Sequence, residues 1–114
     1  MKFSESLKNN KDFHIVYNYG DSKADSYLVM YVRPNGLNEN RLGISVSKKI
    51  GNSVVRHHLT RLIRESYRLS EERFHIGWDL VVVVRKRAAH ATYHQIDESL
   101  LKLAGLHNLI REEN

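Results

Sequence analysis

Apolar and polar residues alternate in two stretches near the middle of the chain, and this pattern predicts β-strands. Residues 27–33 and 41–47 alternate and are rich in β-branched and aromatic side chains, so we expect two strands, the second antiparallel to the first. The sequence Pro-Asn-Gly at 34–36 is a strong turn signal between them. A third strand is expected over 79–85, after a glycine at position 77.

Two helices are predicted from their end signals. The asparagines at 9–10 are candidate N-caps for a helix over about residues 10–18, which Gly20 would end. The sequence Gly-Asn-Ser at 51–53 interrupts the preceding strand and can cap a helix over about residues 54–69. Both helices lie beside predicted strands, which favours a fold in which helices pack on a sheet.

A third helix is predicted near the end of the chain. Thr92 and Gln95 have the spacing of a capping box, in which each side chain bonds the backbone of the other residue. Apolar residues then recur at steps of three and four, at Ile96, Leu100, Leu103, Leu106 and Ile110. The predicted order is α-β-β-α-β-α, an α+β fold with a small mixed sheet, and the pattern leaves open a further short strand between residues 20 and 47.

Composition limits the class of protein. The 114 residues fit one domain spanning 1–114, and 41% hydrophobic residues with a single proline argue against disorder. The absence of cysteine excludes disulfides, cysteine-zinc sites and thiol catalysis. The longest apolar run, 80–84, is far too short to cross a membrane, and residues 1–12 are too polar for a secretory signal. We therefore expect a soluble cytoplasmic protein without a membrane partner.

Positive charge is concentrated in two places. The net charge is +5, but residues 41–68 contain seven Lys or Arg and one Glu, and Arg-Lys-Arg at 85–87 adds three more cations. The rest of the chain is therefore mildly acidic. This distribution predicts a directed phosphate-binding surface rather than a generally basic protein.

The helix predicted over 54–69 places its cations on one side. At 100° per residue, an apolar stripe carries Ser66 together with Val55, Leu59, Leu62 and Ile63, and Tyr67 lies near its seam. Arginines and a histidine share an arc of about 140° on the other side, at Arg56, His57, Arg61, Arg64 and Arg68. A solvated face is the ordinary explanation of a charged arc. Here the arc itself contains no acid, and arginine matches phosphate geometry well, so phosphate binding is favoured.

Small and aromatic side chains indicate a second surface. In the strand 41–47, the apolar residues point to one side, whereas Gly43, Ser45 and Ser47 point to the other and leave room for a ligand. Tyr31 lies on the more polar face of the preceding strand. Phe13 and Tyr17 are four residues apart and lie on one side of the first helix, where they either pack in the core or stack on nucleic-acid bases.

The ordered motif of this chain resembles that of the bacterial ribonuclease P protein subunit. The run SVSKKIGNSVVR over 45–56, continued by RLIRE over 61–65, looks like the family signature, and the resemblance extends upstream to residue 7 and downstream to residue 86. Three positions depart from it. His57 and His58 stand where the family usually has Asn and Arg, and Thr60 stands where it usually has Lys.

The resemblance implies a ribonucleoprotein function. In this family a large RNA carries the catalytic site and its Mg²⁺ ions, and the holoenzyme removes the 5′ leader of precursor tRNA. The family fold is an α/β sandwich, α-β-β-β-α-β-α, with a left-handed βαβ crossover, although right-handed crossovers are the physical norm. By this resemblance the chain contributes no catalytic group and binds no cofactor of its own. Its partners are the catalytic RNA and the precursor tRNA.

The resemblance also assigns residues to two surfaces. The leader-binding cleft lies between the first helix and the open face of the sheet, at Phe13, Tyr17, Tyr31 and Ser45. Contacts to the catalytic RNA match the signature and its neighbours, at Lys48, Lys49, Arg56, His57, Arg61, Arg64 and Arg68. These cations would neutralise phosphate charge and so lower the Mg²⁺ concentration needed to hold RNA and substrate together.

An alternative is a non-catalytic RNA-binding protein of another ribonucleoprotein, such as a ribosomal protein or an RNA chaperone. Composition does not separate the two, and only the ordered motif favours ribonuclease P. The seven histidines do not predict a metal site, because His57 and His58 project about 100° apart on a helix, and His90 and His94 straddle the cap at Thr92. The scattered acids give no sign of a nuclease site within the protein.

Overall fold

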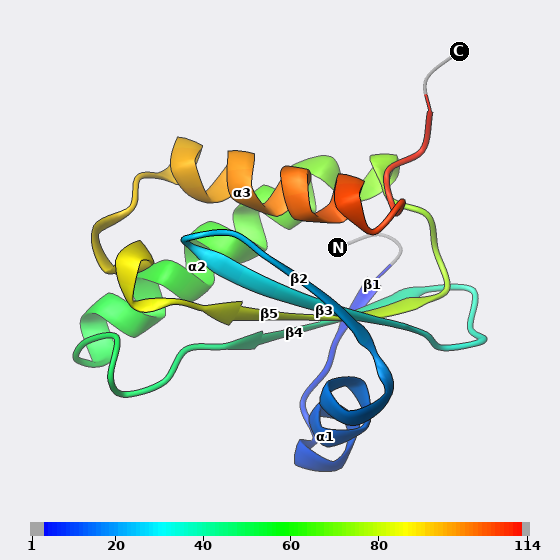
Figure 1. Cartoon of the computed structure of the whole chain (residues 1–114), viewed down its shortest axis with the longest axis horizontal. Helices are drawn as coiled ribbons and strands as arrows, with labels where there is room; N and C mark the ends of the chain where they lie inside the picture. Colours follow the sequence, from blue (N-terminus) through cyan, green and yellow to red (C-terminus); the bar gives the residue numbers. More distant parts are fainter. Residues whose placement is uncertain (1–3, 113–114) are drawn as a thin grey trace.

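The computed structural model describes residues 4–112, in which one sheet separates a single helix from a pair of helices (Figure 1). The strands are β1 (Ser4–Ser6), β2 (Asp21–Ala24), β3 (Leu28–Pro34), β4 (Asn40–Ser45) and β5 (Trp78–Val84). The helices are α1 (Asn10–Tyr19), α2 (Ser53–Ser70) and α3 (Tyr93–Leu106), with short 3₁₀ turns η1 (Glu71–Arg73) and η2 (Lys86–His90). Within the described residues, no helix is both long enough and apolar enough to cross a membrane.

The sheet is mixed, in the order β1-β4-β5-β3-β2. The stretch predicted over 41–47 does run opposite to β3, but the two strands do not pair, because β5 lies between them, antiparallel to β3 and parallel to β4. β5 is the most apolar strand and is buried along most of its length, so it takes the centre of the sheet. α2 connects β4 to β5 as a crossover, and the left-handedness of this crossover stays a prediction.

Two strands went unpredicted or undecided because they are short and polar. β1 and β2 have the sequences SES and DSKA, which show no apolar alternation. Each occupies an edge of the sheet, where one side of the backbone is bonded to a neighbouring strand. Backbone pairing to β4 and β3, rather than burial of side chains, therefore holds them in place.

The predicted helix starts are confirmed. The side chain of Asn9 accepts a hydrogen bond from the Lys11 amide, and that of Asn52 accepts one from the Val55 amide at 3.0 Å. Thr92 and Gln95 form both hydrogen bonds of the capping box, at 2.9 and 3.2 Å. These caps satisfy amides that have no partner inside the helix.

The predicted extent of the last helix is wrong at its end. α3 stops at Leu106, which is 54% exposed and not part of the core. Ile110 lies beyond the helix and pairs its backbone with Phe74 in an isolated bridge. Asn108 adopts a positive φ of 59°, a conformation that turns the chain away from the helix axis and explains the break in periodicity.

Two apolar clusters fill the two faces of the sheet. The larger one lies between the sheet and the helices α2 and α3, and the smaller one lies under α1 around Leu7, Val16 and Val81. Tyr67 was expected near the seam of α2, yet it is 0% exposed. Its hydroxyl is placed 2.6 Å from Ser4 Oγ and 3.2 Å from Asn40 Nδ2, and these partners from β1 and β4 make its burial possible.

Candidate nucleic-acid interface

A surface pocket of about 400 Å³ lies between α1 and the end of β4. Its lining includes three of the four predicted cleft residues, Phe13, Tyr17 and Ser45. α1 contributes one wall through residues spaced three and four apart, and β4 contributes the other where its pairing with β5 ends. The fold thus brings together residues that are far apart in the sequence, and we call this pocket the cleft.

The fourth predicted residue, Tyr31, lies next to the cleft and behind Tyr17. The two rings meet edge to face, with centroids 5.0 Å apart, and the ring of Phe13 lies 6.2 Å from that of Tyr17. Phe13 and Tyr17 pack partly against the small core under α1 and also line the cleft. Both rings thus pack in the core and also line the cleft, so the two predicted roles do not exclude each other.

Two contacts fix α1 over the sheet. The ring of Phe13 lies directly over Gly43, so the small-residue face predicted for β4 is filled at this position. At Ser45 this face lines the cleft. Arg41 forms a two-pronged ion pair with Asp79 of β5, at 2.8 and 2.6 Å, and approaches Asp12 of α1 at 3.7 Å. The hydrogen bonds that Arg41 donates to Asp79 raise the pKa of its guanidinium, and burial offsets this rise only in part. Arg41 is therefore paired with carboxylates inside the fold, and its charge adds little to the predicted phosphate-binding surface.

The cationic side of α2 faces solvent. His57, Arg61, Arg64 and Arg68 are exposed and Arg56 is half-buried, whereas Leu59 and Ile63 on the opposite side are completely buried. Arg61, Arg64 and Arg68 surround a surface depression of about 340 Å³. We call this surface the arginine arc. Its extended, positively charged shape suits the phosphate backbone of RNA.

One arginine of the arc is paired with an acid on the same helix, although the arc itself contains no acid. Arg68 donates two hydrogen bonds to Glu65, at 2.6 and 3.2 Å, because residues three apart are neighbours on a helix surface. The guanidinium of Arg68 lowers the pKa of the Glu65 carboxyl. Arg64 has a weaker tie, a hydrogen bond from Nη1 to Ser6 Oγ at 3.1 Å. Free positive charge on the arc therefore comes mainly from Arg61 and Arg64.

Arg56 differs from its neighbours at its Nε atom. This nitrogen is buried and has no hydrogen-bond partner within residues 4–112. A buried donor of a charged group without a partner is costly, so Arg56 is held less favourably than its neighbours on the arc. Lys48 and Lys49 are exposed in the turn between β4 and α2. This turn joins the cleft to the arginine arc along the chain.

Sequence reasoning missed four residues of the cleft, Asn10, His14, Ile44 and Val46. The spacing that placed Phe13 and Tyr17 on one side of α1 also places Asn10 and His14 there, so this signal was available. Ile44 and Val46 point toward the helices on the opposite face and enter the lining only where β4 ends. Nowhere in the described chain do three or more His, Asp or Glu residues gather in an arrangement that could hold a metal ion.

Comparisons with known proteins agree on one family. The family model described as Ribonuclease P matches residues 1–107. A ribonuclease P protein component of Lachnoclostridium phytofermentans is 55% identical over 107 residues, which is 94% of this chain and 92% of the relative. One of Alkaliphilus metalliredigens is 44% identical over 103 residues, 90% of this chain and 93% of the relative.

Solved structures show the same similarity in three dimensions. The Staphylococcus aureus RNase P protein superposes with a TM-score of 0.86 at 34% identity, over 93% of this chain and 97% of that one. The RNase P protein from Thermotoga maritima gives a TM-score of 0.80 at 32% identity, over 86% of this chain and 93% of that one. The α+β fold is therefore shared along nearly the whole described chain.

Proposed function

The chain belongs to the ribonuclease P protein family and takes part in that endoribonuclease, and we propose that its cleft holds the 5′ leader of precursor tRNA while its arginine arc binds the catalytic RNA. Nothing in the structure favours the alternative, an RNA-binding protein of another ribonucleoprotein. We also propose that the protein acts in the cytoplasm.

One observation carries the assignment of the leader to the cleft. Phe13 and Tyr17 of α1 face Ser45 of β4 across a pocket that is open at the end of the sheet. Unpaired bases of a single strand can stack on aromatic rings, and a small side chain such as Ser45 leaves space for them. A folded tRNA body is too wide for such a pocket, so the single-stranded leader is the part of the substrate that fits.

The arginine arc would act by neutralising charge. Arg61 and Arg64 project from α2 without an ion-pair partner among residues 4–112, so their guanidinium groups can each take a phosphate. The exposed His57 adds hydrogen-bonding capacity and gains positive charge below about pH 6.5. In this proposal the catalytic groups and the Mg²⁺ ions belong to the RNA. The role of this chain is to bind and orient the RNA and its substrate.

The test is reconstitution. The protein is combined with a bacterial ribonuclease P RNA and a 5′-extended tRNA at a Mg²⁺ concentration too low for the RNA to work well alone. We expect correct 5′ cleavage to be faster with the protein than without it, because the arc offsets phosphate repulsion. Absence of any gain would refute the proposal. Cleavage by the protein without RNA would indicate a nuclease site in the chain itself.

A further inference from the structure

The face of β4 that looks toward α1 carries Arg41, Gly43 and Ser45 at alternate positions, because residues two apart in a strand share one face. Nη1 of Arg41 lies 3.7 Å from Oδ2 of Asp12 in α1. Gly43 lies under the ring of Phe13, and Ser45 lines the cleft opposite α1. One face of a single strand therefore contacts α1 at two positions and borders the cleft at the next.

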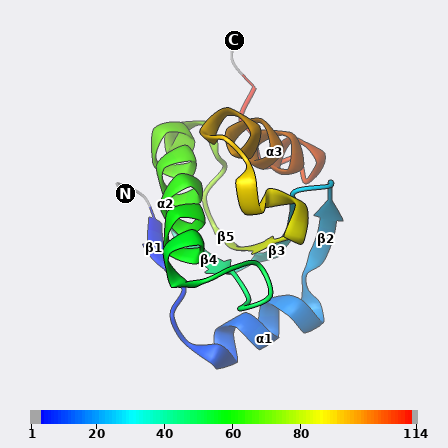
Figure 2. The same cartoon turned by 90° about the vertical axis from the view of Figure 1, so that its left-hand side faces the viewer.

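α1 lies alone on its side of the sheet. Figure 2 shows it beneath the strands, whereas α2 and α3 lie together above them. Its apolar contacts come from the small cluster around Leu7, Val16 and Val81. Among the residues that the structure describes, the pair of Asp12 and Arg41 is the one ion pair or hydrogen bond that joins an α1 side chain to the sheet. The position of α1 therefore depends on few contacts.

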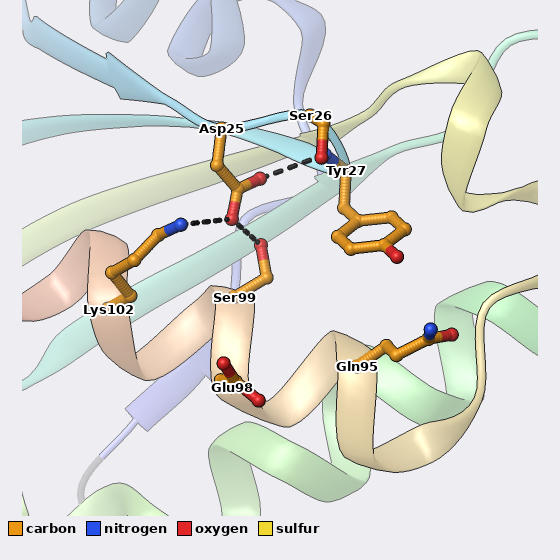
Figure 3. A pocket seen from close by; sticks show the side chains of 7 residues that line it. All are labelled: Asp25, Ser26, Tyr27, Gln95, Glu98, Ser99 and Lys102. Carbon is orange, nitrogen blue, oxygen red and sulfur yellow. Dashed lines mark hydrogen bonds and ion pairs between the residues drawn. The ribbon is translucent and has the colours of Figure 1, made fainter.

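α3, on the other side, has stronger polar contacts with the strands. Oδ2 of Asp25, in the turn between β2 and β3, accepts a hydrogen bond from Ser99 of α3 at 2.6 Å and lies 3.3 Å from Nζ of Lys102 (Figure 3). Oδ1 of the same carboxylate accepts hydrogen bonds from the amides of Tyr27 and Leu28, both at 2.9 Å. The single pair at α1 is longer than any of these contacts, so α1 is the helix whose position is most easily changed.

Arg41 divides its guanidinium between two carboxylates. Nε and Nη2 donate to Asp79 of β5 at 2.8 and 2.6 Å, and Asp79 is only 2% exposed. Nη1 remains to face Asp12, and the side chains of this second pair are 30% and 29% exposed. Because the guanidinium is planar and two of its nitrogens are fixed by Asp79, the sheet determines where Nη1 lies. Asp12, and with it the start of α1, is attracted to that point.

We propose that Asp12 and Arg41 are positioning residues for the leader site, because their ion pair holds α1 at the distance from β4 at which Phe13 and Tyr17 take a leader base. This inference rests on the proposed function, since it concerns the geometry of the same cleft. Asp12 directly precedes Phe13, so a shift of the helix at Asp12 moves the wall of the cleft. Neither member of the pair lines the cleft, and their effect on the leader passes through α1.

A charge effect and a positioning effect have opposite signs for Asp12→Asn. Removing a carboxylate beside the leader would, by charge alone, strengthen the binding of the polyanionic precursor. Loss of the ion pair instead weakens precursor binding and leaves the binding of mature tRNA, which has no leader, unchanged. The pair can bias the position of α1 by no more than its own interaction energy, and for an exposed pair this corresponds to at most about fivefold in affinity.

The experiment measures the dissociation constants of a 5′-extended and a mature tRNA with the reconstituted holoenzyme. Asp12→Asn removes the charge of the α1 partner, and Asp12→Glu keeps it. Arg41→Lys retains a counter-charge for Asp79 but lacks the second arm that faces α1. This variant is needed because Asp12 lies in the first turn of α1, where an acid also stabilises the helix itself. A double variant combines Asp12→Asn with Arg41→Lys.

We expect Asp12→Asn and Arg41→Lys each to lower the ratio of precursor to mature tRNA affinity by about three- to fivefold. The double variant should lower it no further, since both changes break the same pair. Asp12→Glu should keep most of the wild-type ratio. Affinity for the catalytic RNA should match the wild type in all four proteins.

Two controls separate positioning from charge and from stability. Asp21→Asn makes the same charge change just after α1, on an exposed residue without an ion pair in the described part of the chain, and should not lower the ratio. Asp25→Asn weakens the contacts with α3 and so lowers the free energy of unfolding without touching α1. It should also keep the ratio. If the pair were merely structural, the ratio would follow the loss of stability and fall in Asp25→Asn as well.

Four outcomes would overturn the inference. A wild-type ratio in both Asp12→Asn and Arg41→Lys would show that the pair does not position the leader site. Tighter precursor binding by Asp12→Asn would indicate a charge effect, and additive losses in the double variant would mean that the two residues act separately. A ratio that fell in step with stability in every variant would leave the pair a structural role alone. The proposed function survives these results as long as the wild type prefers the precursor, and it fails as well if the wild type binds both tRNAs equally.

Discussion

Gly43 of β4 and Phe13 of α1 are packed so closely that a Cβ atom at position 43 would lie 2.6 Å from Cζ of the Phe13 ring. The same Cβ would lie 3.2 Å from Cβ of Leu7. The missing side chain at position 43 therefore sets how near α1 approaches the sheet. Because Phe13 and Tyr17 line the cleft from α1, this contact also sets the width of the proposed leader site.

Gly43→Ala should change the cleft more than the arginine arc. The new methyl group has no free space, so the Phe13 ring and α1 must shift, at a cost of about 1–3 kcal/mol in the free energy of unfolding. Preference for precursor over mature tRNA should fall, while affinity for the catalytic RNA stays. Gly105→Ala is the control, because no atom lies within 4 Å of its added Cβ, and it should stabilise α3 by about 0.5–1 kcal/mol. An unchanged preference in Gly43→Ala would contradict this view of the cleft.

Arg64→Ala should weaken association with the catalytic RNA. The side chain bonds only Ser6 Oγ within the described chain, so folding stability should change little. Loss of one phosphate contact should lower the log-log salt slope of binding by about 0.7–0.9. Titration of the protein against RNA at several salt concentrations measures this slope. The same slope in wild type and variant would remove Arg64 from the RNA interface.

Glu65→Gln should strengthen RNA binding. The change removes a negative charge from the edge of the arginine arc and releases Arg68 from its ion pair. Hydrogen bonding to Arg68 lowers the pKa of Glu65, so in the wild type the pair persists at neutral pH and is lost only as the pH falls through that lowered pKa. We expect tighter binding at low salt with a slope steeper by up to about 0.9. Glu98→Gln on α3 makes the same charge change away from the arc, and an equal effect there would rule out a local cause.

Asp25→Asn should destabilise the turn between β2 and β3. Burial alone would raise the pKa of this carboxyl, but hydrogen bonds from Ser99 and the Leu28 and Tyr27 amides, with help from Lys102, outweigh it and hold the pKa below its usual value. Because the pKa of Asp25 is lower in the folded state, its carboxylate stabilises the fold at pH values above its unfolded-state pKa of about 3.9. This stabilisation is lost as the pH falls through the pKa of the folded state. We expect a loss of about 1–3 kcal/mol in urea unfolding at neutral pH. If the difference in the free energy of unfolding between wild type and Asp25→Asn did not become smaller in strong acid, the charge of Asp25 would be excluded as its source.

Local signals predicted the helices well. The caps at Asn52 and Thr92 and the position of the arginine arc on α2 depend on residues three to four apart, and such spacings are readable in a sequence. The residues of the cleft could not be predicted from local spacing. Only the family resemblance, or the fold itself, places Phe13 and Ser45 in the same cleft. Their exact neighbours, such as His14, follow from the helical spacing once α1 is known.

Long-range pairing explains what could not be predicted. The central place of β5 depends on its burial between β3 and β4, which no turn signal records. Tyr67 is buried because Ser4 and Asn40, both distant in sequence, supply partners for its hydroxyl. Arg41 contributed to the count of basic residues, yet Asp79 and Asp12 neutralise it in the fold. Counting charged residues in a sequence therefore overestimates the net positive charge that the folded surface offers to a binding partner.

The most direct test of the central claim is the ratio of holoenzyme affinities for precursor and mature tRNA, measured for the wild type, Tyr17→Ala and Tyr17→Phe. If Tyr17 stacks on a leader base, Tyr17→Ala should weaken the binding free energy of the precursor by about 1–3 kcal/mol and leave that of mature tRNA unchanged, so the ratio falls. Tyr17→Phe should keep most of the wild-type ratio. Equal weakening for precursor and mature tRNA in Tyr17→Ala would contradict the account and would return Tyr17 to a purely structural role under α1.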